Sequence, residues 1–359
     1  MKNRIHIVVG LILLYSCANI VAPSGGEKDI VAPKITSINK LYSKDNKQLK
    51  EIFFFFDELI ETNNWEKNFY VSPPTKNIIQ KKINSFKLIL SINDSLKENT
   101  TYNLSLSKCI KDINEGNIMD SLNYIFSTSK IMDSLVLKGT VKDSYTLNFL
   151  DNIWVMLFYK NRHDSIIFKE APNYIAKTNK NGIFYFPNLK NKEYKIIAVS
   201  GEDYIYDNGD QIAFISKFIT LEKDSSISLL AFDPITALDS TILDTLKLVT
   251  DTLKIDSLDV INNIYGSLKV NTSKNTACIF QLLQNGEVVS QFNFNNKPYN
   301  LMGITPGKYQ LKYIEDIDQN KKWSTGSWTL KIQSEKVLNF PSEVTIRSNW
   351  DIELEWELE

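Results

Sequence analysis

Apolar and polar residues alternate along most of the chain after residue 33, in short runs separated by Asn, Asp, Gly or Ser. In the segment 86–92 every second residue is apolar, and the segment 102–106 repeats this pattern. A period of two places the apolar side chains on one face of a β-strand, and long stretches at helical spacing are scarce. The pattern therefore predicts an all-β protein.

Several short segments refine this picture. The run Ile52–Phe56 is continuously apolar, which predicts a central strand covered on both faces. Asn181-Gly182 and Asn285-Gly286 predict tight hairpins, since such pairs accept the left-handed backbone of a two-residue turn. The final run 349–358 alternates strictly and predicts a closing strand. It places these apolar side chains on one face: Trp350, Ile352, Leu354, Trp356 and Leu358. We expect Trp154, Trp350 and Trp356 to pack in cores.

The beginning of the chain has the pattern of a bacterial lipoprotein signal. A basic start, Met1–Arg4, precedes an apolar run from Ile7 to Leu14, and Ser16 stands before Cys17. This order predicts a signal peptide over 1–16, acylation of Cys17 and a flexible tether over 17–32. The alternatives are an uncleaved anchor and an ordinary secretory signal, but a membrane span needs about 20 apolar residues. Because no charged residue follows until Glu27, the prediction is a lipid-anchored outer-membrane protein facing the periplasm rather than the cell surface.

Composition narrows the chemistry. The formal net charge is −1 with both signs interspersed, which argues against nucleic acid as a partner. Outside the predicted signal peptide His163 is the lone histidine, which excludes a His-rich zinc site and disfavours Ser-His-Asp or Cys-His catalysis, because either would have to use this one residue. A carboxylate pair for glycoside hydrolysis stays open, because its separation depends on the fold. Cys109 and Cys278 could form a disulfide, but isolated cysteines in apolar surroundings more often pack as small apolar side chains.

Residues 33–130 resemble the SbsA-type bacterial Ig-like domain. The resemblance is carried by Pro33-Lys34-Ile35, by the strand 53–58 with its acidic end, and by the segments 99–106, 110–117 and 124–128. Residues 22–29 also resemble the tether of Bacteroidetes lipoproteins that carry this domain. The resemblance implies a β-sandwich in an envelope lipoprotein.

Residues 131–233 resemble a carboxypeptidase-regulatory-like, prealbumin-type β-sandwich, through the segments 137–143, 153–159, 178–186 and 189–196. The C-terminal segment 260–359 repeats this pattern, because 304–311 aligns with 189–196 without a gap. Between them, 234–259 is rich in Asp, Ser, Thr and Leu and is predicted to be a linker, with a short helix as the alternative. The predicted organisation is three tandem β-sandwiches after a signal peptide and tether.

One loop has the residues of a calcium site. Asp316, Asp318 and Asn320 place an oxygen-bearing side chain at every second position, which suits a cation that takes six to eight oxygen ligands. The match to an EF-type loop is partial, because Lys321 and Ser327 stand where Gly and Glu are required. The favoured interpretation is instead a turn capped by an Asp side chain, and the acidic segments 112–116 and 202–210 have the same two interpretations in the same order. Calcium is the one cofactor that the sequence suggests.

Four aromatic residues near loops are candidates for sugar contact, namely Trp323, Trp328, Tyr204 and Tyr206. The leading hypothesis is a non-enzymatic, lipid-anchored envelope protein that acts as a structural or interaction scaffold. Its expected partners are the membrane, through the lipid, and an unidentified envelope protein or glycan. The alternative is a glycan-binding accessory lipoprotein, because prealbumin-type units resemble carbohydrate-binding sandwiches.

Overall fold

The computed structural model describes residues 27–43, 48–93, 96–207, 209–221, 225–234 and 265–358. These residues form β-sheets, with one short α-helix, α2 (Trp65–Asn68), and one 3₁₀ turn, η1 (Asp164–Phe168), so the all-β prediction is confirmed. No helix among them is long and apolar enough to cross a membrane. The predicted signal peptide, Cys17, most of the tether and nearly all of the linker lie outside the described residues.

Contacts between Cα atoms divide the chain into two compact units, which are described separately. Unit 1 consists of the residues up to Glu66 together with Gln80–Ile92 and Ser107–Leu122. Unit 2 consists of Lys67–Ile79, Asn93–Leu106 and Asn123–Glu359. Strands from the predicted Ig-like segment therefore occur in both units.

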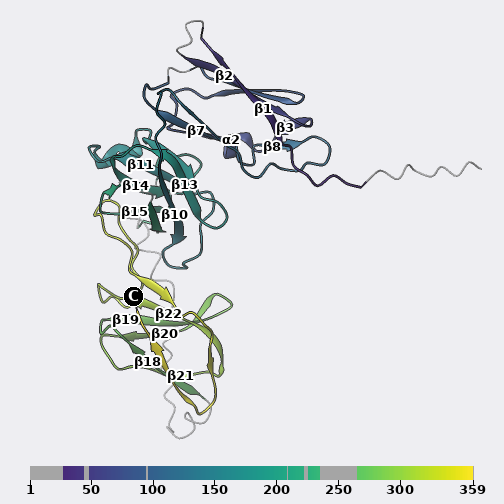
Figure 1. Cartoon of the computed structure of the whole chain (residues 1–359). Helices are drawn as coiled ribbons and strands as arrows, with labels where there is room; N and C mark the ends of the chain where they lie inside the picture. Colours follow the sequence, from purple (N-terminus) through teal and green to yellow (C-terminus); the bar gives the residue numbers. More distant parts are fainter. Residues whose placement is uncertain are drawn as a thin grey trace, which may run out of the picture. The chain divides into compact units, whose positions relative to one another are not determined.

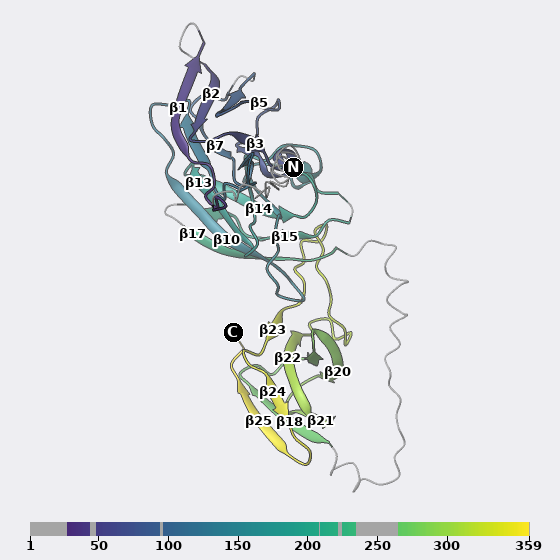
Figure 2. The same cartoon turned by 90° about the vertical axis from the view of Figure 1, so that its right-hand side faces the viewer.

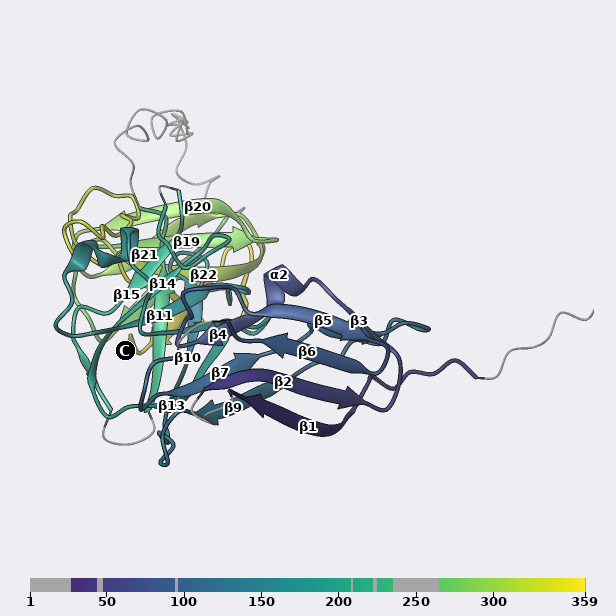
Figure 3. The ribbon, with the colours of Figure 1, turned by 90° about the horizontal axis from the view of Figure 1, so that it is seen from above.

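Unit 1 contains a four-stranded antiparallel sheet in the order β1-β2-β6-β5 (Figure 3). Its strands are β1 (Ile35–Tyr42), β2 (Leu49–Phe56), β6 (Lys87–Ser91) and β5 (Gln80–Asn84), and a separate pair joins β3 (Ile60–Thr62) to β8 (Ile110–Asp112). As predicted, β2 is a central strand. One face buries Ile52 and Phe54 completely. On the other face, the Lys87 ammonium lies 5.5 Å and 5.6 Å from the ring centres of Phe53 and Phe55, so a lysine lies over these two half-buried rings.

Unit 2 begins with the sheet β4-β7-β9, formed by β4 (Tyr70–Ser72), β7 (Thr101–Ser105) and β9 (Asn123–Ser127). All five residues of β7 are buried, although the alternating pattern predicts one polar, exposed face. The reason is that both faces of this strand are covered in the folded chain, which local sequence does not record.

The second sandwich consists of strands β10 to β17 (Figure 1). One sheet has the order β13-β10-β17, formed by β13 (Ile183–Leu189), β10 (Leu135–Asp143) and β17 (Ser225–Ala231). The other has the order β12-β11-β14-β15, formed by β12 (Tyr174–Lys177), β11 (Trp154–Tyr159), β14 (Glu193–Val199) and β15 (Ile212–Phe214). A short strand, β16 (Ile219–Thr220), also pairs with β14.

The third sandwich, strands β18 to β25, has the same plan (Figure 2). Its first sheet, β21-β18-β25, is formed by β21 (Tyr299–Ile304), β18 (Gly266–Thr272) and β25 (Asp351–Trp356). Its second sheet, β20-β19-β22-β23, is formed by β20 (Glu287–Phe294), β19 (Cys278–Gln284), β22 (Gly307–Glu315) and β23 (Val337–Asn339), and β24 (Val344–Ile346) also pairs with β22. In both sandwiches the first strand pairs in parallel with the last, β10 with β17 and β18 with β25.

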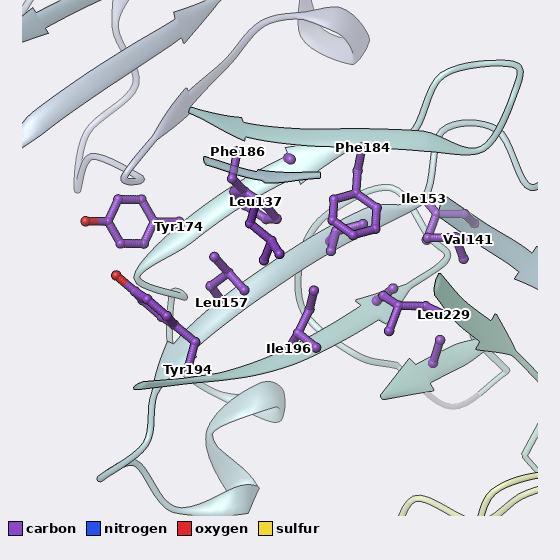
Figure 4. Packing of buried hydrophobic residues seen from close by; sticks show 14 of the residues in the cluster. Leu137, Val141, Ile153, Leu157, Tyr174, Phe184, Phe186, Tyr194, Ile196 and Leu229 are labelled. Atoms are coloured by element: carbon purple, nitrogen blue, oxygen red, sulfur yellow. The ribbon is translucent and has the colours of Figure 1, made fainter. Parts of the chain in front are cut away.

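The core of the second sandwich lies between its two sheets. Figure 4 shows Leu157, Tyr174 and Ile196 from one sheet pointing toward side chains of the other. Phe184 and Phe186 from β13 fill the opposite side, and their rings meet edge to face at 5.8 Å. Alternating residues of each strand thus supply the buried face that the sequence pattern predicts.

The two Asn-Gly pairs behave differently. Asn285-Gly286 joins β19 to β20 as a two-residue hairpin with both residues in the left-handed region, as predicted. The hairpin prediction for Asn181-Gly182 is wrong. These residues join β12 to β13, which belong to different sheets, and the Asn179 carbonyl oxygen closes the turn by accepting the Gly182 N–H at 2.7 Å.

The three tryptophans assigned to cores also differ. Trp154 and Trp356 are 6% and 8% exposed, as predicted. Trp350 is 57% exposed, so its assignment to a core is wrong. The final strand begins only at Asp351, and the Trp350 ring lies 5.0 Å from the Arg347 guanidinium. A tryptophan just before a strand can stay at the surface and stack on a cation.

Cys109 and Cys278 are buried free thiols. Burial raises the pKa of each thiol to about 12. They pack as small apolar side chains and do not form a disulfide.

Candidate functional site

The predicted calcium loop lies in the segment 316–336, which connects two paired strands of the third sandwich. Strand β22 ends at Glu315, just before Asp316 and Asp318, and Glu335 lies just before β23. The two strands are antiparallel neighbours, so both ends of the segment meet at one place. There, one carboxylate oxygen from each of Asp316, Asp318 and Glu335 lies within 4.8 Å of the others. We call these three residues the carboxylate cluster.

Glu335 is the member that the sequence does not reveal. Its Oε1 accepts N–H groups from Ile317 at 2.6 Å and Asp318 at 3.5 Å, and its Oε2 accepts the Ser324 N–H at 2.9 Å. Burial raises the pKa of Glu335, with a smaller contribution from the charge of Asp318, and the three N–H donors oppose this rise. Glu335, at the end of the segment, therefore fixes the backbone at the start of the segment through these hydrogen bonds. Neither its neighbours nor its spacing to Asp316 forms a motif, so no local signal identifies it.

Asp316 is only 4% exposed, yet it is not fully hydrogen-bonded. Its Oδ2 accepts the Lys321 N–H at 3.1 Å, whereas its Oδ1 has no hydrogen-bond partner among the described residues. Burial of an unpaired polar atom costs about 1–3 kcal/mol, and more for a charged group. The cluster thus contains a buried acceptor that the protein leaves open.

Asn320, the third predicted ligand, lies beside the cluster. Its Nδ2 donates to Asp318 Oδ2 at 3.0 Å and to Ser324 Oγ at 2.7 Å, and its Oδ1 accepts the Lys322 N–H at 2.7 Å. Asp318 Oδ2 also accepts the Ser324 hydroxyl at 2.7 Å. In this structure, therefore, Asn320 and Ser324 orient Asp318.

The other two acidic segments form capped turns. In unit 1, Asp112 Oδ1 accepts N–H groups from Glu115 at 2.6 Å and Gly116 at 3.0 Å, and its Oδ2 accepts the Asn117 N–H at 2.7 Å. Burial raises the pKa of Asp112, but these backbone donors outweigh it and hold the pKa below its ordinary value. In the second sandwich, Asp203 Oδ1 accepts the Ile205 N–H at 2.8 Å.

The four candidate sugar-binding aromatics are distributed over two clusters. Tyr206 and Trp328 are 7% and 8% exposed and belong to one apolar cluster together with Trp154, and Tyr204 is partly buried against this cluster. Trp323 is half-buried elsewhere, where its ring lies 5.1 Å from Tyr145 and its Nε1 donates to the Glu335 carbonyl oxygen at 3.2 Å. The structure therefore does not bring the four together, and their role in glycan contact stays a prediction.

The outer aromatic cluster covers the face of sheet β12-β11-β14-β15 opposite to the core of the second sandwich. The Trp154 ring meets Tyr70 from β4 at 5.6 Å and Tyr204 at 5.7 Å, both edge to face. At the far strand of the same sheet, Trp328 meets Phe214 at 5.1 Å. The buried members of this cluster are Trp154, Met156, Phe158, Ile167, Ile175, Ile197, Val199, Tyr206, Ile212, Phe214, Phe232 and Trp328.

Polar contacts fix both margins of this cluster. Beside β4, the Ile175 N–H donates to Ser72 Oγ at 3.0 Å, and Lys177 Nζ donates to the Lys67 carbonyl oxygen at 3.0 Å. The Lys177 ammonium also lies 4.1 Å from the Trp154 ring centre. Burial, together with the charge of Lys67, lowers the pKa of Lys177 to about 8.

On the side of the third sandwich, the segment 316–336 supplies the contacts. Thr325 Oγ1 donates to the Asp233 carbonyl oxygen at 2.6 Å, and Gln333 Nε2 donates to the Phe214 carbonyl oxygen at 3.0 Å. Gly326 packs so closely that a Cβ atom there would lie 2.5 Å from Cζ of Phe232. The segment is therefore shaped to fit this face of the second sandwich.

A second junction joins the same two sandwiches. Tyr145 Oη donates to Gln281 Oε1 at 2.9 Å. Lys312 is 4% exposed, and its Nζ donates to the Tyr145 carbonyl oxygen at 2.8 Å and lies 3.9 Å from the Tyr145 ring centre. Burial lowers the pKa of Lys312.

One part of the chain matches a known protein family. Residues 29–128 match the family model described as bacterial Ig-like domain. No curated protein matches the chain. The part of the chain that matches is the part for which the sequence resemblance implies an Ig-like domain.

Similar solved structures have low sequence identity. The minor pilin GBS52 of Streptococcus agalactiae is 14% identical over 62% of this chain and 95% of its own, with a TM-score of 0.21. A DUF3823 family protein from Parabacteroides merdae is 9% identical over 60% of this chain and 100% of its own, with a TM-score of 0.20. The N-terminal part of the bacterial S-layer protein SbsC is 14% identical over 52% of this chain and 45% of its own, with a TM-score of 0.21.

Proposed function

We propose that this chain is a non-enzymatic, lipid-anchored protein of the bacterial cell envelope that acts as a structural or interaction scaffold. Two observations support the location in the cell envelope and the non-enzymatic role. The basic, apolar and cysteine-containing start has the order of a lipoprotein signal, with Cys17 as the acylated residue. The match of residues 29–128 to a bacterial Ig-like domain supports a modular, non-catalytic role.

The outer aromatic cluster is the observation that carries the scaffold proposal. Domains within a chain move relative to one another by default, unless the interface between them is large and hydrophobic. Here, one apolar cluster takes Tyr70 from β4, Trp154 from the second sandwich and Trp328 from the 316–336 segment of the third. A shared apolar cluster of this kind stabilises the packing of β4 and of the 316–336 segment on the second sandwich, which supports a scaffold role.

The buried polar and ionisable groups also support a structural role. The Tyr194 and Tyr309 hydroxyls close turns, and the thiols of Cys109 and Cys278 are packed in apolar surroundings. His163, the lone histidine outside the leader, is exposed, and its Nδ1 contacts the neighbouring Ser165. The two hydroxyls and the two thiols stabilise the fold, and none of them requires a substrate to explain its position.

The anchor is tested with the full chain in a bacterial host that carries out lipoprotein processing. We expect Cys17 to incorporate radioactive palmitate and the protein to fractionate with the outer membrane. Cys17→Ser removes the label and releases the protein from the membrane, whereas Cys109→Ala, the matched control, keeps both. Absence of label on the wild-type chain would contradict the anchor.

The scaffold role is tested by chemical crosslinking in intact cells. We expect one defined envelope protein to be crosslinked to the wild-type chain. The same crosslinked product should be absent when the chain carries Cys17→Ser. A purified chain that hydrolyses envelope polysaccharide, with the activity lost on substitution of a carboxylate pair, would contradict the non-enzymatic assignment.

A further inference from the structure

We propose that Asp316, Asp318 and Glu335 bind a calcium ion, and that the bound ion fastens the 316–336 segment against the second sandwich. This proposal is independent of the lipid anchor and of any partner. It rests on the positions of the three carboxylates, on the open oxygen of Asp316, and on the contacts that the segment makes beyond them.

The separation of the carboxylates suits an ion of this size. Their nearest oxygens lie within 4.8 Å of one another. Calcium binds oxygen at about 2.4 Å, so two ligands on opposite sides of one ion are about 4.8 Å apart. The three carboxylates are therefore within the spacing that ligands of one shared calcium ion require.

The open oxygen of Asp316 points to a missing ligand. Only 4% of the surface of Asp316 is exposed, and its Oδ1 has no hydrogen-bond partner among the described residues. Three carboxylates so close together also repel one another when ionised. A bound divalent cation removes both costs, because it coordinates the open oxygen and offsets the negative charges.

The donor atoms select the kind of ion. All three side chains offer oxygen, and neither histidine nor cysteine contributes, which favours calcium or magnesium over zinc. Magnesium requires near-ideal octahedral geometry at about 2.0–2.1 Å, whereas calcium accepts irregular sites with carboxylates, carbonyl groups and water. Carboxylates from two ends of one segment form an irregular set, so we assign calcium. Water molecules complete the coordination.

The location of the site explains what the ion does. Asp316 and Asp318 follow the end of β22, and Glu335 lies just before β23. The ion therefore joins the two ends of the segment. Between them, a tight turn closed by hydrogen bonds between Ser327 and Ile332 carries Trp328 to Phe214 of the second sandwich. Fixing the base of the segment reduces the freedom of the part that holds this tryptophan in place.

Binding is tested by calorimetric titration of calcium chloride into the full chain, purified in detergent and stripped with a chelator. We expect one ion per chain, and magnesium chloride to bind at least about tenfold more weakly. Terbium, which replaces calcium, should emit when tryptophan is excited, because the Trp323 indole is hydrogen-bonded to the Glu335 carbonyl oxygen. Absence of calcium binding to the wild-type chain, or equal affinity for magnesium, would overturn the proposal.

Three variants locate the ion. Asp316→Asn and Glu335→Gln keep the side-chain shape and should each weaken calcium binding about tenfold or more. Asp318→Asn changes an exposed residue, so it tests calcium binding at the cluster even if either buried variant fails to fold. Asp203→Asn, in the acidic loop of the second sandwich, is the matched control and should bind as the wild type does. Wild-type affinity in a folded Asp318→Asn chain would overturn the assignment.

Fastening of the segment is tested by limited trypsin digestion. Lys321 and Lys322 are exposed cleavage sites within the segment, and Lys180 in the β12–β13 turn is the internal control. At a calcium concentration ten times Kd, linkage lowers the opened population about tenfold, so cleavage after Lys321 and Lys322 should slow about tenfold while cleavage after Lys180 is unchanged. Equal cleavage of the segment with and without calcium would overturn the fastening step.

Discussion

Tyr194 and Tyr309 occupy equivalent positions in the second and third sandwiches and make the same hydrogen bond. Each hydroxyl donates at 2.7 Å to the carbonyl oxygen four residues earlier, of Lys190 and Thr305 respectively. A tyrosine that closes the turn before its own strand in this way resembles the tyrosine corner of other β-sandwiches. The ungapped alignment of 304–311 with 189–196 therefore reflects a shared structural element.

We expect Tyr194→Phe and Tyr309→Phe each to lower the free energy of unfolding by about 1 kcal/mol, because each removes one hydrogen bond and leaves a carbonyl without its partner. Urea denaturation measures the change. Tyr185→Phe, at a 49% exposed position on β13, is the control and should have no effect. If both corner variants were as stable as this control, the hydroxyls would have no structural role.

Asp112 predicts a dependence of stability on pH. Its backbone donors hold the folded-state pKa below the ordinary value of 3.8. In the acid range the unfolded chain therefore binds more protons than the folded one, so Asp112 contributes stability above pH 4 that is lost as the pH falls through the folded-state pKa.

We accordingly expect Asp112→Asn to be less stable than the wild type at pH 7, and the difference to shrink on acidification. Asp120→Asn, at an exposed position of the same unit, is the control. Thermal unfolding at several pH values measures this. A difference between Asp112→Asn and the wild type that stays constant from pH 7 to pH 3 would exclude the charge of Asp112 as the cause.

The two buried thiols should be unreactive in the folded protein. With pKa values near 12, only about one thiol in ten thousand is ionised at pH 8, and burial also blocks access. In a chain carrying Cys17→Ser, we expect iodoacetamide to modify neither Cys109 nor Cys278 until urea unfolds the protein, after which it modifies both. Mass spectrometry detects each adduct. A mass two hydrogens lower without reagent would instead indicate a disulfide.

Strands could be predicted from the sequence wherever one face of the strand is buried and the other is exposed, because apolar and polar residues then alternate. The alternation that places Leu88 and Leu90 in the core of unit 1 is local, and so is the left-handed turn at Asn285-Gly286. Pairing is not local. Asn181-Gly182 has the same turn chemistry, but it changes sheets instead of making a hairpin, because its two flanking strands find different partners.

The candidate site was predictable only in part for the same reason. The order of Asp316, Asp318 and Asn320 indicates oxygen ligands on one loop, whereas Glu335 reaches them only because β22 and β23 are paired. Burial of Tyr206 and Trp328 likewise depends on residues far along the chain. The sequence near a loop does not show whether an aromatic side chain is buried, because its burial depends on packing partners that are distant along the chain.

Trp328 of the third sandwich packs on Phe214 and thereby helps to hold the second sandwich in place. Hydrogen exchange of the full chain, followed by mass spectrometry, measures it directly at β15, where Phe214 packs on Trp328. We predict that Trp328→Ala speeds amide exchange in Ile212–Phe214 about tenfold or more, whereas Thr329→Ala, at an exposed neighbouring position, does not. Unchanged exchange in β15 of a folded Trp328→Ala chain would contradict the coupling of the two sandwiches.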